Sequence, residues 1–284
     1  MKTLIITFAL LVGGYNELFA ESPLPPHALS LPVLISLSSG ESGSGFFIGT
    51  SNHLFLATAS HVLFDKNTHK LQCNQANVSW YFDDGTNFYQ NEIRVDLEAL
   101  QTNKEIRIHP THDVVVARLG WFVTTTNFQL GNVFDPRMVQ RVSTNINPLF
   151  VNNAGLQKLK EVAIGDDVYV FGYPSSVGLK QSPKFDYSKP LLRKGIVSGI
   201  YDQTQTIIID AAVYFGNSGG PVVEKNVSGV VSPNFRVIGI ASEIIPFFDV
   251  WENKRYEYLN VNVSNSGYAV VEPVDFIVQL LWDN

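Results

Sequence analysis

The chain has 284 residues, of which 45% are hydrophobic and 16% are charged, so it can bury a sizeable core and does not have the composition of a disordered protein. The formal net charge is −6 and basic residues form no stripe, which argues against a nucleic-acid binder. Valine, isoleucine, threonine and aromatic residues recur between glycines and prolines, a balance that favours many short β-strands over long helices.

Residues 1–20 have the pattern of a secretory signal peptide. Lys2 supplies the positive start, residues 4–12 form an apolar run, and Leu18-Phe19-Ala20 predicts cleavage after Ala20. The run is shorter than the roughly 20 residues that a membrane span needs, and no later segment reaches that length. The mature protein is therefore predicted to be secreted or periplasmic, with no membrane span. Because Cys73 is the only cysteine, no internal disulfide is expected.

After the signal peptide, two blocks of predicted strands flank a polar connection. Residues 21–125 are expected to form a first β-barrel, and the predicted strands are Val33–Leu37, Gly45–Gly49, Leu54–Thr58, Val78–Phe82, Ile93–Asp96, Glu105–Ile108 and Val114–Leu119. Residues 126–165 are rich in asparagine and are expected to connect the barrels. Residues 166–284 are expected to form a second barrel, and the predicted strands are Val168–Gly172, Leu191–Tyr201, Gln205–Ile209, Pro221–Val223, Val237–Ser242 and Tyr268–Val271. The period changes to that of a helix over Glu272–Leu281.

Three short motifs carry residues suited to nucleophilic catalysis. Ser218 lies in Gly216-Asn217-Ser218-Gly219-Gly220, where glycines permit a tight turn that exposes the hydroxyl and point the N–H groups of Gly216 and Ser218 into one oxyanion hole. His61 follows an apolar strand that runs into small residues, and it is a candidate general base. Asp113 precedes the apolar strand Val114–Leu119, where it can orient a histidine. Each motif alone also fits an ordinary turn or strand end.

The order of the three motifs decides between the known triad arrangements. The serine motif also fits the Gly-x-Ser-x-Gly elbow of α/β-hydrolases, but that order needs a histidine after the serine, and all six histidines precede Ser218. The subtilisin order needs an aspartate before the histidine, and the first aspartate, Asp65, follows His61. Only the order His61, Asp113, Ser218 remains.

These motifs resemble those of the trypsin-like, chymotrypsin-fold serine peptidases, and specifically the bacterial HtrA/Deg and glutamyl-endopeptidase branches. Thr58-Ala59-Ser60-His61 is similar to the family's Thr-Ala-(Ala/Ser)-His, and the segment from Asp210 to Pro221 is similar to the HtrA nucleophile segment. The likeness covers roughly residues 33–275. It implies an all-β fold of two six-stranded antiparallel barrels with a C-terminal helix, and a serine endopeptidase with the triad His61, Asp113 and Ser218. No metal or other cofactor is required.

Several positions depart from the family's pattern. HtrA proteins carry a PDZ domain after the protease; since the 284 residues leave no room for one after the expected second barrel, regulation by a PDZ domain in cis is not expected. Asn217 stands where animal trypsins have an aspartate that pairs with a newly cut N-terminus, so activation by that ion pair is not expected.

The substrate-binding positions implied by the resemblance are Ala212, Ala241, Ser242, Glu243 and Ile244. Ala212 occupies the place where trypsin-like pockets hold their charge, which argues against a pocket for Lys or Arg. Ala241 replaces the histidine of glutamyl endopeptidases, and Ser242 resembles the serine that supports the catalytic aspartate. Ile244 in place of a glycine would narrow the pocket, which predicts a preference for small or aliphatic side chains.

Two other classes of function remain open. The same fold can serve as a binding or holdase protein in which hydrolysis is weak or gated, and the same site can act as an esterase. The expected partners are protein or peptide substrates, and the sequence does not give the oligomeric state.

Overall fold

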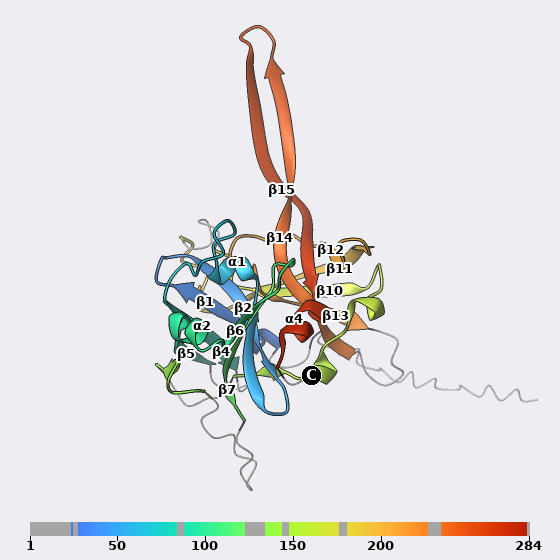
Figure 1. Ribbon diagram of the computed structural model, residues 1–284. Coiled ribbons are helices and arrows are strands. Elements are labelled where there is room, and N and C mark those ends of the chain that lie inside the picture. The colour runs from blue at the N-terminus through green and yellow to red at the C-terminus, as the bar shows by residue number, and fades with distance from the viewer. Residues whose placement is uncertain are drawn as a thin grey trace, which may run out of the picture.

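The computed structural model describes residues 24, 28–83, 88–122, 134–143, 148–175, 181–226 and 234–282 (Figure 1). The predicted signal peptide lies outside the described residues, as does part of the predicted connection between the barrels.

The first half forms one curled sheet of nine strands. In chain order they are β1 (Pro32–Leu37), β2 (Ser42–Gly49), β3 (His53–Thr58), β4 (Gln75–Asp83), β5 (Phe88–Asp96), β6 (Ile106–Ile108), β7 (Val115–Trp121), β8 (Val139–Arg141) and β9 (Phe150–Val151). Neighbours pair in the order β6-β7-β3-β2-β1-β4-β5-β8, and β9 lies parallel to β2. The helices of this half are α1 (Ser60–Leu63), α2 (Leu97–Thr102) and the short 3₁₀ turns Ala28–Ser30, Asn153–Gly155 and Leu159–Glu161.

The second half is a closed six-stranded barrel. Its strands are β10 (Asp167–Gly172), β11 (Leu191–Tyr201), β12 (Thr206–Asp210), β13 (Pro221–Asn226), β14 (Asn234–Asn253) and β15 (Tyr258–Pro273), joined in the order β10-β11-β12-β15-β14-β13. The described strands of this barrel all pair antiparallel with their neighbours. Helix α4 (Val274–Leu280) follows directly after β15.

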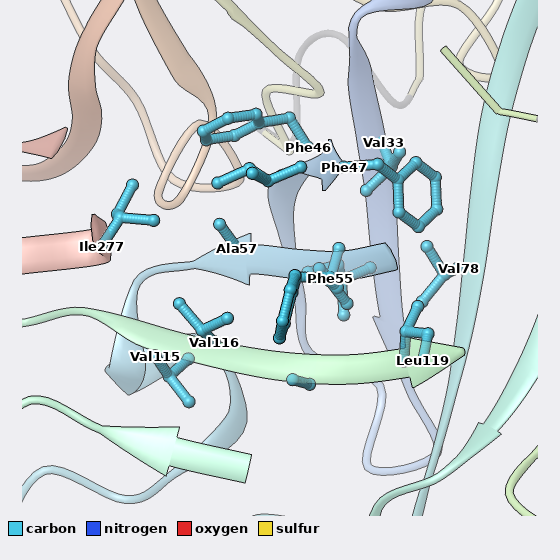
Figure 2. Packing of buried hydrophobic residues seen from close by; sticks show 14 of the residues in the cluster. Val33, Phe46, Phe47, Phe55, Ala57, Val78, Val115, Val116, Leu119 and Ile277 are labelled. Atoms are coloured by element: carbon cyan, nitrogen blue, oxygen red, sulfur yellow. The ribbon is translucent and has the colours of Figure 1, made fainter. Parts of the chain in front are cut away.

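The core of the first sheet extends onto the C-terminal helix. On β1 the side chains of Val33, Ile35 and Leu37 alternate into this core, as the period of two in a strand requires. Ile277 of α4 belongs to the same core and lies near the end of β3 that carries Ala57 (Figure 2). The Trp282 ring, just beyond α4, stacks on Phe55 with 5.6 Å between ring centroids. Helix α4, which ends the second half of the chain, thus packs into the core of the first sheet.

The structure confirms the all-β fold with two curled antiparallel sheets and a short C-terminal helix. Six strands are found in the second barrel, whereas the first sheet has nine. Helix α4 begins at Val274 rather than Glu272, because Pro273 takes the N-cap position and Glu272 still belongs to β15. Helix α2 was not predicted, although Asp96 caps it by accepting a hydrogen bond from the Ala99 N–H at 2.9 Å.

The largest feature missing from the sequence prediction is a long hairpin between β14 and β15. The predicted strands end at Ser242 and resume at Tyr268, but the two observed strands remain paired from Gly239↔Pro273 out to Asn253↔Tyr258. The outer part stands clear of the barrels (Figure 1). Residues 259–264 alternate apolar and polar side chains, a period-of-two signal that the sequence prediction did not use. The side chains are mostly exposed on both faces.

Candidate active site

His61 and Asp113 meet at the edge of the first sheet. Strand β3 ends in small residues and leads into α1, which carries His61, while Asp113 lies in the turn between β6 and β7. His61 Nδ1 lies 2.6 Å from Asp113 Oδ2, and the His61 N–H donates to Oδ1 at 3.0 Å. The Asp113 carboxylate therefore binds both the imidazole ring and the backbone N–H of His61.

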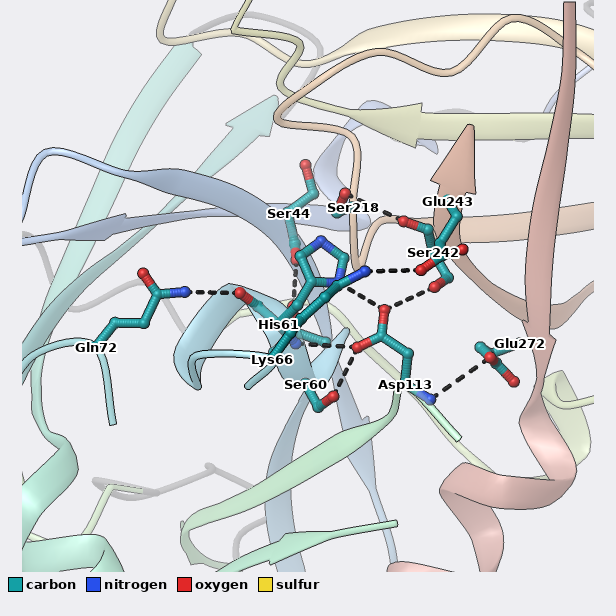
Figure 3. Close-up of polar contacts among 11 residues, drawn as sticks. Ser44, Ser60, His61, Lys66, Gln72, Asp113, Ser218, Ser242, Glu243 and Glu272 are labelled. Carbon is teal, nitrogen blue, oxygen red and sulfur yellow. Dashed lines mark hydrogen bonds and ion pairs between the residues drawn. The ribbon is translucent and has the colours of Figure 1, made fainter. Parts of the chain in front are cut away.

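Two hydroxyl groups complete the surroundings of the Asp113 carboxylate. The Ser60 hydroxyl donates to Oδ1 and the Ser242 hydroxyl to Oδ2, each at 2.6 Å (Figure 3). Burial opposes ionisation of Asp113, but the hydrogen bond and charge interaction with His61 and the two hydroxyl groups outweigh it and hold the pKa of this carboxyl well below its usual range. Asp113 is therefore a buried anion that can stabilise a protonated imidazole.

Ser218 approaches this pair from the second barrel, in the turn between β12 and β13. Its hydroxyl donates to the Ser242 carbonyl at 3.4 Å rather than to His61 (Figure 3). A long nucleophile contact is common in a site without substrate, where the productive hydrogen bond forms only in the complex.

The loop around Ser218 leaves two N–H groups, those of Gly216 and Ser218, without an acceptor among the described residues. The Phe215 carbonyl accepts a hydrogen bond from the Ser175 N–H at 2.6 Å. Because a trans peptide points its N–H opposite to its carbonyl, the Gly216 N–H faces away from Ser175. Gly216 has a φ of +90°, which favours glycine. Among the described residues, none accepts a hydrogen bond from the N–H of Gly216 or of Ser218.

Ser44 of β2 fastens this loop to the first sheet. Its hydroxyl donates to the Gly216 carbonyl at 2.6 Å and accepts from the Tyr173 N–H at 2.9 Å. Its backbone N–H donates to the Ser218 carbonyl at 2.8 Å. Gly219 also passes close to this strand, and a Cβ atom there would collide with the Ser44 carbonyl. One buried serine thus holds both residues that supply the candidate oxyanion hole.

Two hollows adjoin Ser218 and His61. One, of about 450 Å³, also includes Ser175 and Gly216. The other, of about 340 Å³, is lined by side chains that include Val213, Ser242, Glu243 and Ile244. Phe215 is 79% exposed and lines both hollows, so it separates two sides of a cleft that passes Ser218.

The five predicted substrate-binding residues fall into two groups. Ser242, Glu243 and Ile244 line the smaller hollow. Ala241 is fully buried in the core of the second barrel, and Ala212 lines neither hollow. The motif Thr58-Ala59-Ser60-His61 contained Ser60 without singling it out, and Ser44 lies just before the predicted strand Gly45–Gly49. Ser60 directly precedes His61, which is a local signal, whereas the contact of Ser44 with Gly216 spans 172 residues and leaves none.

Lys66 crosses the cleft to the second barrel. Its Nζ lies 2.7 Å from Glu243 Oε1, at the edge of the smaller hollow (Figure 3). Both side chains are half exposed, so the pair is weak and can open at little cost.

A second histidine–carboxylate pair lies behind Asp113. His112 Nδ1 lies 2.9 Å from Glu272 Oε2, and the Asp113 N–H donates to Glu272 Oε1 at 3.5 Å. The His112 ring stacks on Phe276 of α4, with 3.5 Å between centroids. Within the described ranges, no three His, Cys, Asp or Glu side chains gather as a metal site would require. The part of the chain that the structure describes also has no helix long and apolar enough to cross a membrane.

Comparisons with solved structures find serine proteases. The HtrA-type protease AlgW, solved with a tripeptide, is 17% identical with a TM-score of 0.47, and the alignment covers 89% of this chain and 60% of that one. A serine endoprotease from Yersinia pestis is 18% identical with a TM-score of 0.44, covering 90% and 66%. Deg5 is 17% identical with a TM-score of 0.48, covering 89% and 88%. The chain thus spans less than two thirds of the first two proteins.

Sequence comparisons give the family. No curated protein matches the chain. The family model described as "Trypsin-like peptidase domain" matches residues 43–231, a range that includes His61, Asp113 and Ser218. This match confirms the resemblance noted in the sequence, and the protein therefore belongs to the trypsin-like peptidase domain family.

Proposed function

We propose that the protein is an exported serine endopeptidase with the triad His61, Asp113 and Ser218. The observation that carries the proposal is the Asp113 carboxylate, which accepts hydrogen bonds from Ser60, His61 and Ser242 and holds the imidazole beside Ser218. These donors keep the Asp113 carboxylate charged and fixed in position, as a catalytic histidine requires and an ordinary surface histidine does not.

In the proposed reaction, Ser218 Oγ attacks the carbonyl carbon of the scissile peptide bond. His61 Nε2 takes the hydroxyl proton and then gives it to the leaving amine as the C–N bond breaks, which leaves an acyl-enzyme. Water then attacks the acyl carbon and passes one proton to His61, which gives it to Ser218 Oγ as the ester C–O bond breaks; the product leaves as a carboxylic acid, which ionises by losing its proton to solvent. The Asp113 anion stabilises the imidazolium in both steps.

The negative charge that develops on the carbonyl oxygen needs preorganised donors. The N–H groups of Gly216 and Ser218 are suited to this role, because no described residue uses them, the Ser175 N–H holds the peptide unit of the Gly216 N–H through the Phe215 carbonyl, and Ser44 holds the carbonyls of Gly216 and Ser218. Removing one such donor typically costs about 10²–10³ in rate.

The substrate class follows from the smaller hollow. Its walls include the apolar side chains of Val213 and Ile244, and its charged groups, Lys66 and Glu243, neutralise each other. We infer a preference for small or aliphatic side chains at the residue before the scissile bond. Cleavage of a peptide library predominantly after basic or acidic residues would contradict this preference.

The pattern of residues 1–20 supports export to the periplasm or the cell exterior, with cleavage after Ala20. N-terminal sequencing of the protein recovered outside the cytoplasm tests this, and a chain that still begins at Met1 would contradict it.

Incubation of residues 21–284 with casein, beside a Ser218→Ala variant, tests the activity. Cleavage by the wild type alone, with fluorophosphonate labelling of Ser218, is expected. Binding of casein with no cleavage and no labelling would favour the binding or holdase function. Hydrolysis of an ester but not of the matched peptide amide would favour an esterase.

A further inference from the structure

The outer hairpin of the second barrel, residues 245–266, is called the ribbon here. It comprises the outer parts of β14 and β15, which pair with each other from Pro246↔Asn265 to Asn253↔Tyr258. The neighbouring strands stop before it, since β12 pairs with β15 only at Tyr268–Val271 and β13 pairs with β14 only up to Ile240. Among the described strands, the ribbon is therefore only two strands wide, and it projects from the body (Figure 1).

One face of the ribbon is mostly apolar and aliphatic. Because paired residues and alternate residues share a face, the register assigns this face five apolar side chains, each between 46% and 63% exposed: Phe248, Val250, Leu259, Val261 and Val263. Its charged member is Glu252. The opposite face is mixed, with the exposed aromatic side chains of Phe247, Trp251 and Tyr258 among polar residues that include Asp249, Asn260 and Asn262. A two-stranded ribbon is marginally stable in water by itself, and a contiguous exposed apolar surface is typical of a binding site.

The ribbon continues the strand that lines the candidate active-site cleft. Ser242, Glu243 and Ile244 line the smaller hollow with Ser218 and His61, and the next residue of β14 is the first of the ribbon. From Ala241 onward, no described strand pairs with β14 on the side that faces β13. A polypeptide that lies beside Ser242 and Ile244 in the cleft can therefore extend directly onto the ribbon.

We propose that the apolar face of the ribbon binds an extended, apolar segment of the polypeptide substrate, N-terminal to the scissile bond. This proposal rests on the peptidase function proposed above. Antiparallel pairing, which β14 already makes with both of its neighbours, would direct the residues before the scissile bond from Ser242 toward the ribbon. The occupant is thus an unfolded chain, because a folded domain cannot thread the cleft and cover the ribbon in extended form.

Side chains rather than a continuous backbone ladder make this contact. Pro246 has no N–H, and a bulge interrupts the strand between Ile244 and Pro246, so added backbone pairing stops there. Beyond it, recognition depends on apolar contact. At ~3.3 Å per residue, the nine residue steps from Ile244 to Asn253 extend about 30 Å, so the ribbon contacts about the fifth to the twelfth residue before the scissile bond and acts only on substrates long enough to reach it.

The first test measures binding without cleavage. Fluorescein-labelled, unfolded casein is titrated with the Ser218→Ala protein, with or without the substitutions Val250→Thr, Val261→Thr and Val263→Thr. Threonine retains the strand propensity and shape of valine, so the ribbon is kept while its apolar face is lost. The matched control carries Asp249→Thr, Asn260→Thr and Asn262→Thr on the opposite face. We expect Kd to rise about tenfold with the valine substitutions and less than twofold in the control.

The second test uses protein with Ser218 intact. A casein cleavage site found by mass spectrometry is synthesised with four or with fourteen preceding residues, the additional ten being rich in Val, Leu and Phe. The valine substitutions should lower kcat/KM about tenfold for the long peptide and less than twofold for the short one. Equal losses on both peptides, or no loss, would overturn the proposal.

The outcomes separate this proposal from the peptidase function. Valine-dependent casein binding with no cleavage and no labelling of Ser218 would contradict the peptidase and retain a ribbon that binds unfolded chains. Cleavage with unchanged binding would overturn the ribbon proposal alone. A wild-type dimer that the valine substitutions convert to a monomer, measured by sedimentation, would show that a second copy covers the face and would also overturn it.

Discussion

The Ser242 hydroxyl donates to Oδ2 of Asp113 at 2.6 Å, while the Ser242 carbonyl accepts the Ser218 hydroxyl at 3.4 Å. One residue of β14 thus touches both the acid and the nucleophile of the proposed triad. Because β14 also lines the cleft and continues into the ribbon, the position of a bound chain and the geometry of the triad depend on the same strand.

Substitution Ser242→Ala should lower kcat about 10- to 100-fold. It removes one donor from a buried carboxylate, and a hydrogen bond to a charged group contributes about 1.5–3 kcal/mol. The Ser242 carbonyl remains, so KM for a short peptide should change little. Steady-state kinetics check this, with Ser242→Thr as the conservative control. A Ser242→Ala enzyme with unchanged kcat would show that Asp113 does not need this donor.

Substitution Ser44→Ala should lower kcat by at least tenfold with little change in KM. The Gly216 carbonyl would lose its buried donor and the Tyr173 N–H its acceptor, so the loop could rotate and misdirect the Gly216 N–H. That N–H acts on the oxyanion of the transition state, not on the bound substrate. Affinity for a peptide aldehyde, which forms a tetrahedral adduct, should therefore fall in parallel with kcat. A rise in KM alone would contradict the role assigned to Ser44.

Glu224 predicts a pH dependence of stability. Its side chain is fully buried and accepts hydrogen bonds from Gln157 and from the Ala163 N–H, and burial raises its pKa to about 7. Since the folded pKa lies above the unfolded value of 4.5, its contribution to stability is complete below about pH 4.5 and is lost as the pH rises through 7.

Substitution Glu224→Gln should remove this dependence. Relative to the wild type, the free energy of unfolding of the variant should increase by an amount on the order of 2 kcal/mol between pH 5 and pH 8. Urea unfolding at the two pH values measures the difference. A constant difference between variant and wild type at both pH values would show that Glu224 does not titrate in this range.

Substitution Ile277→Ala should reduce the free energy of unfolding by about 2–5 kcal/mol, because it leaves a cavity where α4 enters the core of the first sheet. Gln279→Ala, at an exposed position of the same helix, is the control; it removes only the exposed hydrogen bond of Gln279 Oε1 with His109 at 3.2 Å and should change stability by less than about 1 kcal/mol. Equal effects of the two substitutions in urea unfolding would show that α4 does not contribute to that core.

The sequence predicted those features that depend on neighbouring residues. Strand β1 was recognisable because Val33, Ile35 and Leu37 alternate with less buried positions, and the three motifs were recognisable because each is a short local pattern. In the ribbon, Leu259, Val261 and Val263 also alternate with polar residues, but this local pattern was not recognised as a strand, and the face it forms is exposed rather than part of a core. Ser44 was overlooked because its partner Gly216 is distant in sequence, and Ala241 was misjudged as a cleft residue because only the fold shows its burial.

Helix α4 makes assembly of the two halves interdependent. Phe55 of β3 stacks on Trp282. Ile277 of α4 belongs to the same core as the buried residues of α1, the helix that carries His61. Until the chain has been made and released as far as Trp282, the first sheet lacks part of its core and Ser218 lacks a fixed partner. Contacts between such distant segments form late in folding. The arrangement that brings His61 beside Ser218 is therefore expected to form only after α4 has packed against the first sheet, late in folding.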